Sequence, residues 1–263
     1  MRLGVMVLAC TAACGRVGFD ARGDGGDGGD GGGDGPGSGA DGSTPDSLPP
    51  NLAGSLFAWY PLDEDTTVGT ARDASGHGRT MTCTPPPRCP RPMPGRTQGV
   101  TAALFDGGDT MSWQPTGTEA DLPRFTTAAW VSLRRRPSDF EMVVSRPLAG
   151  GSANSFALDH ASTGQLEYYS QGGASLFSAM TLPIGTWTHV AIAYDGTSKY
   201  VFINGALEGS GSTGVMLTYD GSPLTLGADI TAGTTDHFFM GQIADVMIFD
   251  RALSAGEVSQ LVP

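Results

Sequence analysis

The segment KYVFINGALE, residues 199–208, places Asn204 and Gly205 between two runs of alternating apolar residues. Asn and Gly tolerate a positive φ, and a type I′ turn requires a positive φ at both of its central positions. The segment therefore predicts a tight β-hairpin with Asn204-Gly205 as its two-residue loop. A hairpin of this kind is typical of an antiparallel β domain.

Short apolar runs continue in both directions from this hairpin, separated by clusters of Gly, Asp, Ser and Asn. Many short strands with turn signals between them favour an all-β fold, here a two-sheet antiparallel jelly-roll sandwich. Ser254 and Glu257 have the spacing of a capping box, which predicts one short C-terminal helix. The predicted strands cover residues 56–60, 102–105, 126–133, 141–145, 156–159, 165–170, 186–194, 199–203, 224–226 and 242–249.

The first 14 residues have the pattern of a secretory signal peptide, with Arg2 before an apolar run and small residues after it. The segment Thr11-Ala12-Ala13-Cys14 resembles the lipobox of bacterial lipoproteins, in which the Cys is lipidated, although Leu is usual at the position of Thr11. A lipobox ending at Cys10 and an ordinary signal peptide are the alternatives. The prediction is an exported protein of the cell envelope, anchored to the outer membrane through lipid on Cys14, or extracellular.

Residues 15–51 form a Gly/Asp/Pro-rich stretch with very few apolar side chains. Such a segment cannot bury enough apolar surface to offset the entropy of ordering the chain. Its repeated Gly-Gly-Asp triplets invite comparison with calcium-binding repeats, but those need an apolar residue in every repeat. We therefore expect a disordered, self-repelling linker that carries a folded domain over residues 52–263 away from the membrane.

The chain is acidic, because 15 Lys and Arg stand against 27 Asp and Glu, a formal net charge of −12. Such a chain repels phosphate backbones, which argues against nucleic acid as a partner. No apolar run reaches the roughly 18 residues that a transmembrane helix requires. The sequence thus predicts contact with a membrane through the lipid anchor only.

Cys83 and Cys89 flank the segment TPPPR. Two cysteines this close, held by three prolines in an exported protein, predict a disulfide that clamps a loop. A zinc site is disfavoured, because no second Cys or His pair stands nearby at ligand spacing.

Seven phrases in order give the chain its resemblance to the LamG-like jelly roll of the concanavalin A-like lectin/glucanase superfamily. They are AWYPLD at 58–63, DASGHG at 73–78, ALFDG at 103–107, FTTAAWV at 125–131, GTWTHV at 185–190, VFING at 201–205 and GQIADVMIFDRALS at 241–254. The resemblance covers residues 54–262. It implies the jelly-roll fold, and it leaves function open because this fold hosts lectins, sugar-binding modules, adhesion domains and hydrolases.

A structural Ca²⁺ is a hypothesis that the resemblance supports, since members of the family often carry one. Asp245 interrupts the apolar run from Ile243 to Ile248, and a charge there is costly unless it is paired or bound to a metal. The family pattern of an early DxSGxG loop and a late acidic residue makes Asp73 and the carbonyl of Gly76 its expected co-ligands. The alternative is that Asp245 accepts hydrogen bonds from turn amides.

A carbohydrate site needs exposed rings that stack on a pyranose and polar groups that reach its hydroxyls. Each candidate ring has a plain alternative role in the core. The candidates, which stand near polar or loop segments, are Trp113, Tyr168, Tyr169, Tyr219, His237 and Phe238.

No catalytic constellation is found: the Glu-x-Asp-x-x-Glu motif of the superfamily's glucanases and the Gly-x-Ser-x-Gly elbow are both absent. We therefore expect a non-catalytic cell-surface recognition module that binds carbohydrate. A protein–protein adhesion or structural module is the alternative, and a glycan-processing enzyme is a more remote one.

Overall fold

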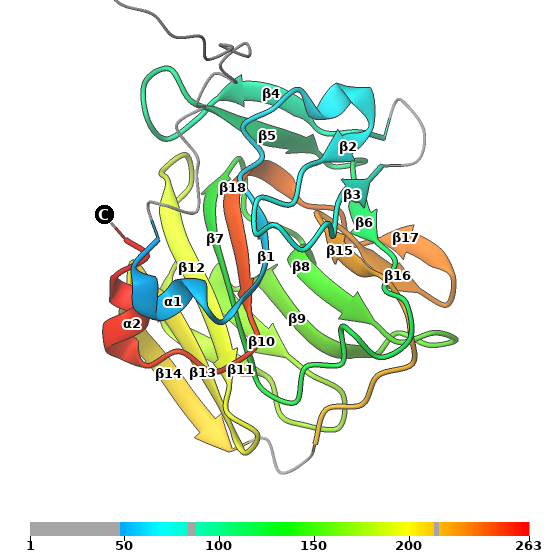
Figure 1. Cartoon of the computed structure of the whole chain (residues 1–263), viewed down its shortest axis with the longest axis vertical. Helices are drawn as coiled ribbons and strands as arrows, with labels where there is room; N and C mark the ends of the chain where they lie inside the picture. Colours follow the sequence, from blue (N-terminus) through cyan, green and yellow to red (C-terminus); the bar gives the residue numbers. More distant parts are fainter. Residues whose placement is uncertain (1–47, 84–87, 213–215, 263) are drawn as a thin grey trace, which may run out of the picture. The chain divides into compact units, whose positions relative to one another are not determined.

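The computed structural model describes residues 48–83, 88–212 and 216–262. Within these ranges the fold is all-β, and the predicted two-sheet antiparallel sandwich is confirmed (Figure 1). The signal peptide, Cys14, Cys10 and the linker as far as residue 47 lie outside the described residues.

One sheet of the described region has the strand order β14-β13-β12-β7-β18-β5-β4, with β1 also paired to β18. Its neighbouring strands are antiparallel throughout. We call it the first sheet. Its strands are β1 (Leu56–Tyr60), β4 (Arg91–Pro94), β5 (Thr101–Asp106), β7 (Phe125–Leu133), β12 (Thr188–Tyr194), β13 (Ser198–Ile203), β14 (Ala206–Ser212) and β18 (Met240–Phe249).

The second sheet has the order β11-β10-β9-β8-β15-β6-β3-β2 among the described strands. A separate two-stranded hairpin, β16 (Asp229–Thr231) with β17 (Thr234–Asp236), lies against β8. The strands of the second sheet are β2 (Thr70–Ala71), β3 (Met81–Thr82), β6 (Met111–Trp113), β8 (Phe140–Pro147), β9 (Asn154–Ala161), β10 (Gln165–Tyr169), β11 (Leu176–Thr181) and β15 (Leu224–Leu226).

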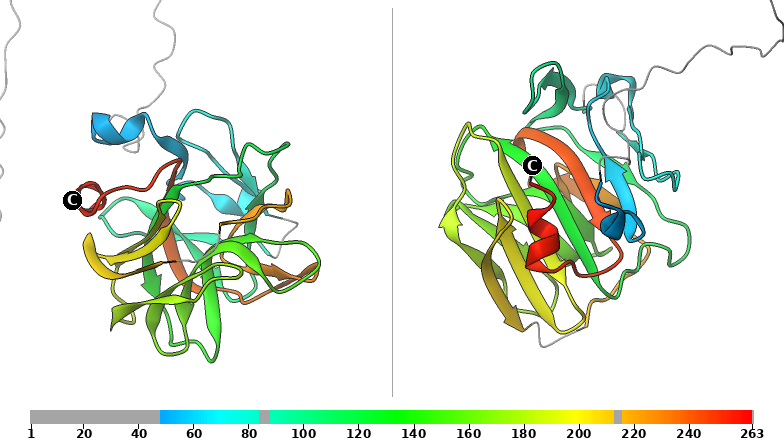
Figure 2. Two further views of the ribbon diagram at one scale, coloured as in Figure 1. Left: turned by 90° about the horizontal axis from the view of Figure 1, so that it is seen from below. Right: turned by 60° about the vertical axis from the view of Figure 1, so that its left-hand side comes forward.

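The main core lies between the two sheets and takes alternate side chains from each, as the period of two of a β-strand requires. The strands β7 and β12 are nevertheless buried at every residue. The outer face of the first sheet is covered by α1 (Pro50–Ala53), α2 (Ala255–Ser259) and the segments beside them, and Figure 2 shows both helices on that side. The first sheet keeps one pocket of about 370 Å³ beside α2, lined by Tyr200, Leu207 and Leu253 among others, and the second sheet has another pocket on its outer face.

The hairpin at Asn204-Gly205 is confirmed. Ile203 pairs with Ala206, and φ is +48° at Asn204 and +78° at Gly205, as a type I′ turn requires. The predicted C-terminal helix is confirmed as well, because Ser254 and Glu257 form a complete capping box at the start of α2.

Candidate functional site

A pocket of about 320 Å³ opens on the outer face of the second sheet, across β8, β9 and β10 and beside the hairpin β16–β17. Its strand residues alternate with residues that point into the core: Glu167 and Tyr169 line the pocket, whereas Leu166 and Tyr168 are fully buried between the sheets. The lining consists of Phe140, Met142, Ser152, Asn154, Asp159, Glu167, Tyr169, Ser175, Asp229, Thr231 and His237.

Two carboxylates stand side by side on the pocket floor. Asp159 of β9 and Glu167 of β10 are direct cross-strand partners, and Asp159 is only 2% exposed. Burial raises the pKa of the Asp159 carboxyl well above its usual range, and the negative charges of Glu167 and Asp229 add to the shift. Asp159 Oδ1 has no hydrogen-bond partner in the described region.

A third carboxylate, Asp229, comes from the start of β16 and is held rigidly. Its Oδ1 accepts a hydrogen bond from Ser145 Oγ at 3.1 Å, and its Oδ2 accepts one from Asn154 Nδ2 at 3.0 Å. Ser145 belongs to β8 and Asn154 to β9, so Asp229 joins the hairpin to the sheet. Its carboxylate is thereby fixed at the pocket wall before any ligand arrives.

Two aromatic groups face this acidic wall. Tyr169 is half-buried at the end of β10. His237 stacks on Phe140 with ring centroids 4.1 Å apart and ring planes 14° apart, and one of its nitrogens, Nδ1, lies 2.8 Å from Asp236 Oδ1. Rings of this kind can contact the C–H face of a sugar, while the carboxylates can accept hydrogen bonds from its hydroxyls.

Of the predicted sugar-binding residues, the structure brings Tyr169 and His237 together in this pocket. The prediction for Tyr168 is wrong, because that ring is fully buried in the core, where period-two alternation points it away from the pocket. Trp113 and Tyr219 pack against the core and do not line the pocket: Trp113 meets the ring of Phe57, and the Tyr219 hydroxyl donates to the carbonyl of Leu122. Phe238 is half-buried beside His237 in the chain.

The predicted calcium ligands lie on either side of β1, away from this pocket. Asp73 Oδ1 accepts hydrogen bonds from the backbone N–H groups of Trp59 and Ser75, and its Oδ2 accepts one from that of Arg79. These bonds outweigh the effect of partial burial and lower the pKa of Asp73, and the Gly76 that follows is exposed.

Asp245 sits at an irregularity in the pairing of β18 with β7, with a φ of +48°. It lines a small pocket together with Asp63 and Arg96, and burial raises its pKa while the Arg96 charge opposes that shift. Calcium at Asp73, Gly76 and Asp245 stays a prediction.

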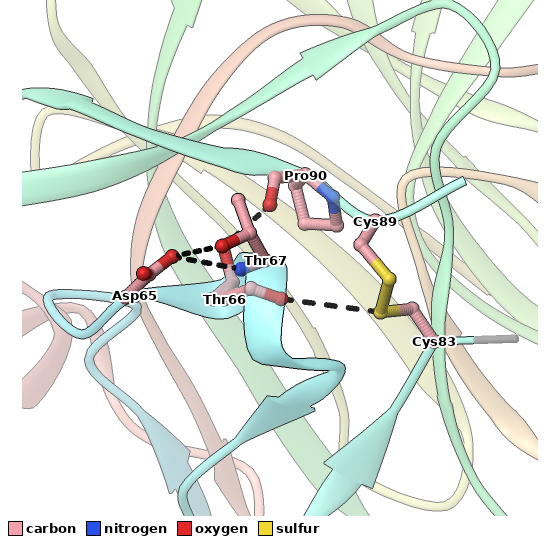
Figure 3. Close-up of a disulfide and its surroundings, with 6 residues drawn as sticks. All are labelled: Asp65, Thr66, Thr67, Cys83, Cys89 and Pro90. Carbon is pink, nitrogen blue, oxygen red and sulfur yellow. Dashed lines mark hydrogen bonds between the residues drawn. A yellow bond between two sulfur atoms is a disulfide. The ribbon is translucent and has the colours of Figure 1, made fainter. Parts of the chain in front are cut away.

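The predicted disulfide is confirmed, and it joins Cys83 to Cys89 with the two Cα atoms 5.4 Å apart. Figure 3 shows it beside η2 (Thr66–Val68), where Thr66 Oγ1 donates to the carbonyl of Pro90 at 2.7 Å. The Asp65 carboxylate accepts a bond from the N–H of Thr67 and begins this short helix. The bridge is structural and is not part of the pocket.

The pocket contains residues that sequence reasoning missed, namely Asp159, Glu167, Asp229 and Phe140. The two carboxylates on β9 and β10 carried a weak signal, since each follows a buried leucine, Leu158 or Leu166, within a predicted strand. Asp229 and Phe140 carried none, because each lies just outside a predicted strand, Asp229 after 224–226 and Phe140 before 141–145.

Comparison with known proteins agrees with this architecture. The family model of the concanavalin A-like lectin/glucanases superfamily matches residues 105–259, and the chain belongs to that superfamily. A search of curated proteins finds no match. Among the described residues, no helix is long and apolar enough to cross a membrane.

Solved structures share the fold at low sequence identity. Domain 4 of AbnA, a GH43 extracellular arabinanase from Geobacillus stearothermophilus solved with arabinotriose, matches at 19% identity and a TM-score of 0.60, covering 80% of this chain and 98% of that one. The binding domain of Paraclostridial Mosquitocidal Protein 1 matches at 16% identity and a TM-score of 0.62, covering 80% of this chain and 52% of that one.

Trypanosoma rangeli sialidase also matches, at 16% identity and a TM-score of 0.59 over 80% of this chain. This chain spans 32% of the length of the sialidase. Identities this low bear on the fold and not on the residues of the site.

Proposed function

We propose that this protein is a non-catalytic recognition module that binds carbohydrate in the pocket on the outer face of β8, β9 and β10. The observation that carries the proposal is the combination of the Tyr169 ring with an array of hydrogen-bond acceptors on the sheet face that the helices leave open. A sugar offers the matching features, an apolar C–H face and several hydroxyl donors. The arabinotriose bound to the similar arabinanase domain supports a glycan as the ligand class.

The charge of the pocket narrows the class of sugar. Asp159, Glu167 and Asp229 line it, and none of its described lining residues is Lys or Arg. A sugar that carries a carboxylate would be repelled at short range, where charges interact most strongly. Neutral sugars with adjacent hydroxyl groups, and amino sugars, are therefore the ligands we propose.

A glycan array probed with the purified full chain tests this function. Wild type is expected to bind a defined group of neutral or amino sugars, and Tyr169→Ala is expected to lose that binding. Tyr200→Ala is the matched control, because Tyr200 is a half-buried tyrosine on β13 of the other sheet. Binding that survives Tyr169→Ala, or selective binding of acidic sugars, would count against the pocket.

The non-catalytic part of the proposal has its own test. Asp159 and Glu167 stand adjacent, and adjacent carboxylates also occur in retaining glycosidases. Each glycan that the array identifies is incubated with wild type, and the release of reducing sugar is measured. We expect none, and turnover that disappears in Glu167→Gln would show that the protein is an enzyme.

Protein adhesion is the second candidate, favoured by apolar side chains at one edge of the sandwich. Phe177 and Met180 of β11 and Leu207 of β14 are 40%, 53% and 49% exposed, and these two strands lie against each other. Exposed apolar side chains that cluster are typical of protein contacts. Loss of cell adhesion in Phe177→Ser together with Leu207→Ser, with sugar binding intact, would favour this role.

Export and lipid anchoring of the module complete the proposal. Metabolic labelling with a fatty acid is expected to label wild type and Cys10→Ser, and to miss Cys14→Ser. Labelling that is lost in Cys10→Ser and kept in Cys14→Ser would show that the lipidated residue is Cys10. An absence of labelling in wild type would favour an ordinary signal peptide.

A further inference from the structure

We infer that the pocket also contains a divalent metal site formed by Asp229, Asp236 and His237, with Asn154 as an additional oxygen ligand. Metal binding here is independent of whether the pocket binds sugar. The site is separate from the calcium ligands expected at Asp73, Gly76 and Asp245.

The first observation is the convergence of three ligand groups. One potential ligand atom each of Asp229, Asp236 and His237 lies within 4.8 Å of the other two. The hairpin is responsible: Asp229 opens β16 and is the register partner of Asp236, which closes β17, so both carboxylates stand at the same end. His237 follows directly with a φ of +49°, and its ring is held in one plane by the stack on Phe140.

The second observation is a set of buried oxygen atoms without partners. Asn154 is 1% exposed, and its Nδ2 donates to Asp229 Oδ2, yet its Oδ1 has no hydrogen-bond partner among the described residues. Asp159 Oδ1, in a side chain 2% exposed, also has no partner in the part of the chain that the structure describes. Both residues line the same pocket as Asp229 and His237. A buried acceptor that stays unpaired costs about 1–3 kcal/mol, and a bound cation would satisfy it.

The third observation is an excess of acidic groups. Asp159, Glu167 and Asp229 line the pocket, and Asp236 stands beside Asp229. No Lys or Arg is found among the described lining residues, although Lys199 interacts electrostatically with Glu167. Negative charges that gather in a low-dielectric site repel one another strongly. A doubly charged cation removes this repulsion more effectively than protonation of a single carboxyl group.

The ligand types select the metal. Ca²⁺ prefers oxygen atoms alone, whereas an imidazole with two carboxylates suits first-row transition metals, and Zn²⁺ ranks above Mn²⁺ in affinity for such sites. His237 Nδ1 faces Asp236, and its Nε2 lies 3.9 Å from Asp139 Oδ2. In metal sites the second nitrogen of a histidine usually donates a hydrogen bond to a carboxylate, and Asp139 is a carboxylate on that side of the ring, although 3.9 Å is beyond hydrogen-bond distance. We therefore assign the site to Zn²⁺ or a similar ion.

Isothermal titration calorimetry of the EDTA-stripped full chain, without sugar, tests the assignment. Cys10 and Cys14 are alkylated beforehand so that their thiols cannot bind the metal. Wild type is expected to bind one Zn²⁺ per chain, more tightly than Mn²⁺ and far more tightly than Ca²⁺. His237→Asn and Asp236→Asn each remove a proposed ligand and are expected to weaken Zn²⁺ binding by about 100-fold or more, because removing a residue that only supports a ligand already costs about 10- to 100-fold.

Both variants are designed to fold. Asn tolerates the positive φ at position 237, and Asn at position 236 can still accept the hydrogen bond from Thr231 Oγ1. Asp250→Asn, which changes an exposed carboxylate on the first-sheet side, is the matched control and should bind Zn²⁺ like wild type. Thermal unfolding in EDTA confirms that all variants are folded.

The outcomes are distinct. Absence of saturable Zn²⁺ binding by wild type, or unchanged binding by both variants, would overturn the site. Ca²⁺ binding tighter than Zn²⁺ binding would overturn the role of His237 as a ligand. Because no sugar is present, a failed glycan array leaves each of these results unaffected.

Discussion

Asp159 and Glu167 are direct cross-strand partners on β9 and β10, and both reach the pocket on the outer face of the second sheet. One residue along each strand, Leu158 and Tyr168 form the next cross-strand pair and lie in the core. The same two strands therefore supply the pocket with their polar residues and the core with their apolar ones. The period of two of a β-strand separates the two functions.

Tyr168→Phe is expected to leave sugar binding unchanged and to stabilise the protein by on the order of 1 kcal/mol, the cost of an unpaired buried hydroxyl. The Tyr168 hydroxyl is buried and has no hydrogen-bond partner in the described region. Urea unfolding and the glycan array measure the two effects. A loss of sugar binding in this variant would show that the Tyr168 hydroxyl contributes to the pocket after all.

His189→Gln is expected to reduce the loss in the free energy of unfolding that accompanies a fall in pH below 6.5. Burial, with a smaller contribution from the Arg96 charge, lowers the pKa of His189 from 6.5 to about 4. Between pH 6.5 and about pH 4, His189 is protonated in the unfolded chain but stays neutral in the folded chain. Its contribution to the free energy of unfolding is therefore complete above pH 6.5 and is lost as the pH falls from 6.5 to about 4. At about 1.4 kcal/mol per pKa unit, His189 accounts for about 3 kcal/mol of this decline.

The measurement for His189 is urea unfolding at pH 7 and pH 4.5 of wild type and variant. Buried carboxyl groups such as Asp109, whose pKa is raised to about 6 chiefly by burial, change stability in the opposite direction, so the difference between the proteins is the relevant quantity. His160 has a pKa lowered to about 4 by burial and remains in the variant. An equal decline in both proteins would contradict the assignment to His189.

Replacing both Cys83 and Cys89 by Ser is expected to lower the free energy of unfolding by about 2 kcal/mol, the value the chain-entropy model gives for so short a loop. The two cysteines are six positions apart. Thermal unfolding of the double variant and of reduced wild type should agree. Sugar and Zn²⁺ binding should persist, because the bridge lies outside the pocket, and their loss would show that the bridge supports the site.

Gly205→Ala is expected to destabilise the protein by roughly 1–2 kcal/mol or more, because the left-handed conformation is costly for a residue with a Cβ. Gly205 has a φ of +78°, and a Cβ there would lie 3.0 Å from the Cα of Ser259 in α2. Gly76 also has a positive φ, but it lies in an exposed turn with open space around the Cβ position. Gly76→Ala should therefore show the loss of stability from the left-handed conformation alone, without a contact like that with Ser259. Equal losses in the two variants would mean that contact with α2 adds nothing.

Calcium at the predicted loop is tested by metal analysis of the purified chain and by Ca²⁺ titration of Asp245→Asn. If Asp73, Gly76 and Asp245 hold the ion, Ca²⁺ raises the melting temperature of wild type and of Asp236→Asn but not of Asp245→Asn. The two variants thus separate this site from the proposed zinc site. An absence of any Ca²⁺ effect on wild type would reject the calcium hypothesis.

Local features were predicted well from the sequence because they depend on residues a few positions apart. The Asn204-Gly205 turn needs two adjacent residues that accept a positive φ, and the capping box at Ser254 needs a partner three positions on. The predicted strand at Leu56–Tyr60 matches the observed β1. The strand β11 was missed because it is largely exposed at a sheet edge and lacks the apolar pattern of a buried strand.

The sequence by itself thus determined the sandwich, the hairpin at the edge of its first sheet, its terminal helix and its disulfide. Only the tertiary structure decided which face stays open and which side chains meet there. Asp159, Glu167 and Asp229 come from three separate strands, and Asp229 is 62 positions beyond Glu167 in the chain. A local pattern describes a residue's neighbours in the chain, whereas strand order and the covering of the first sheet by α1 and α2 determine its neighbours in space.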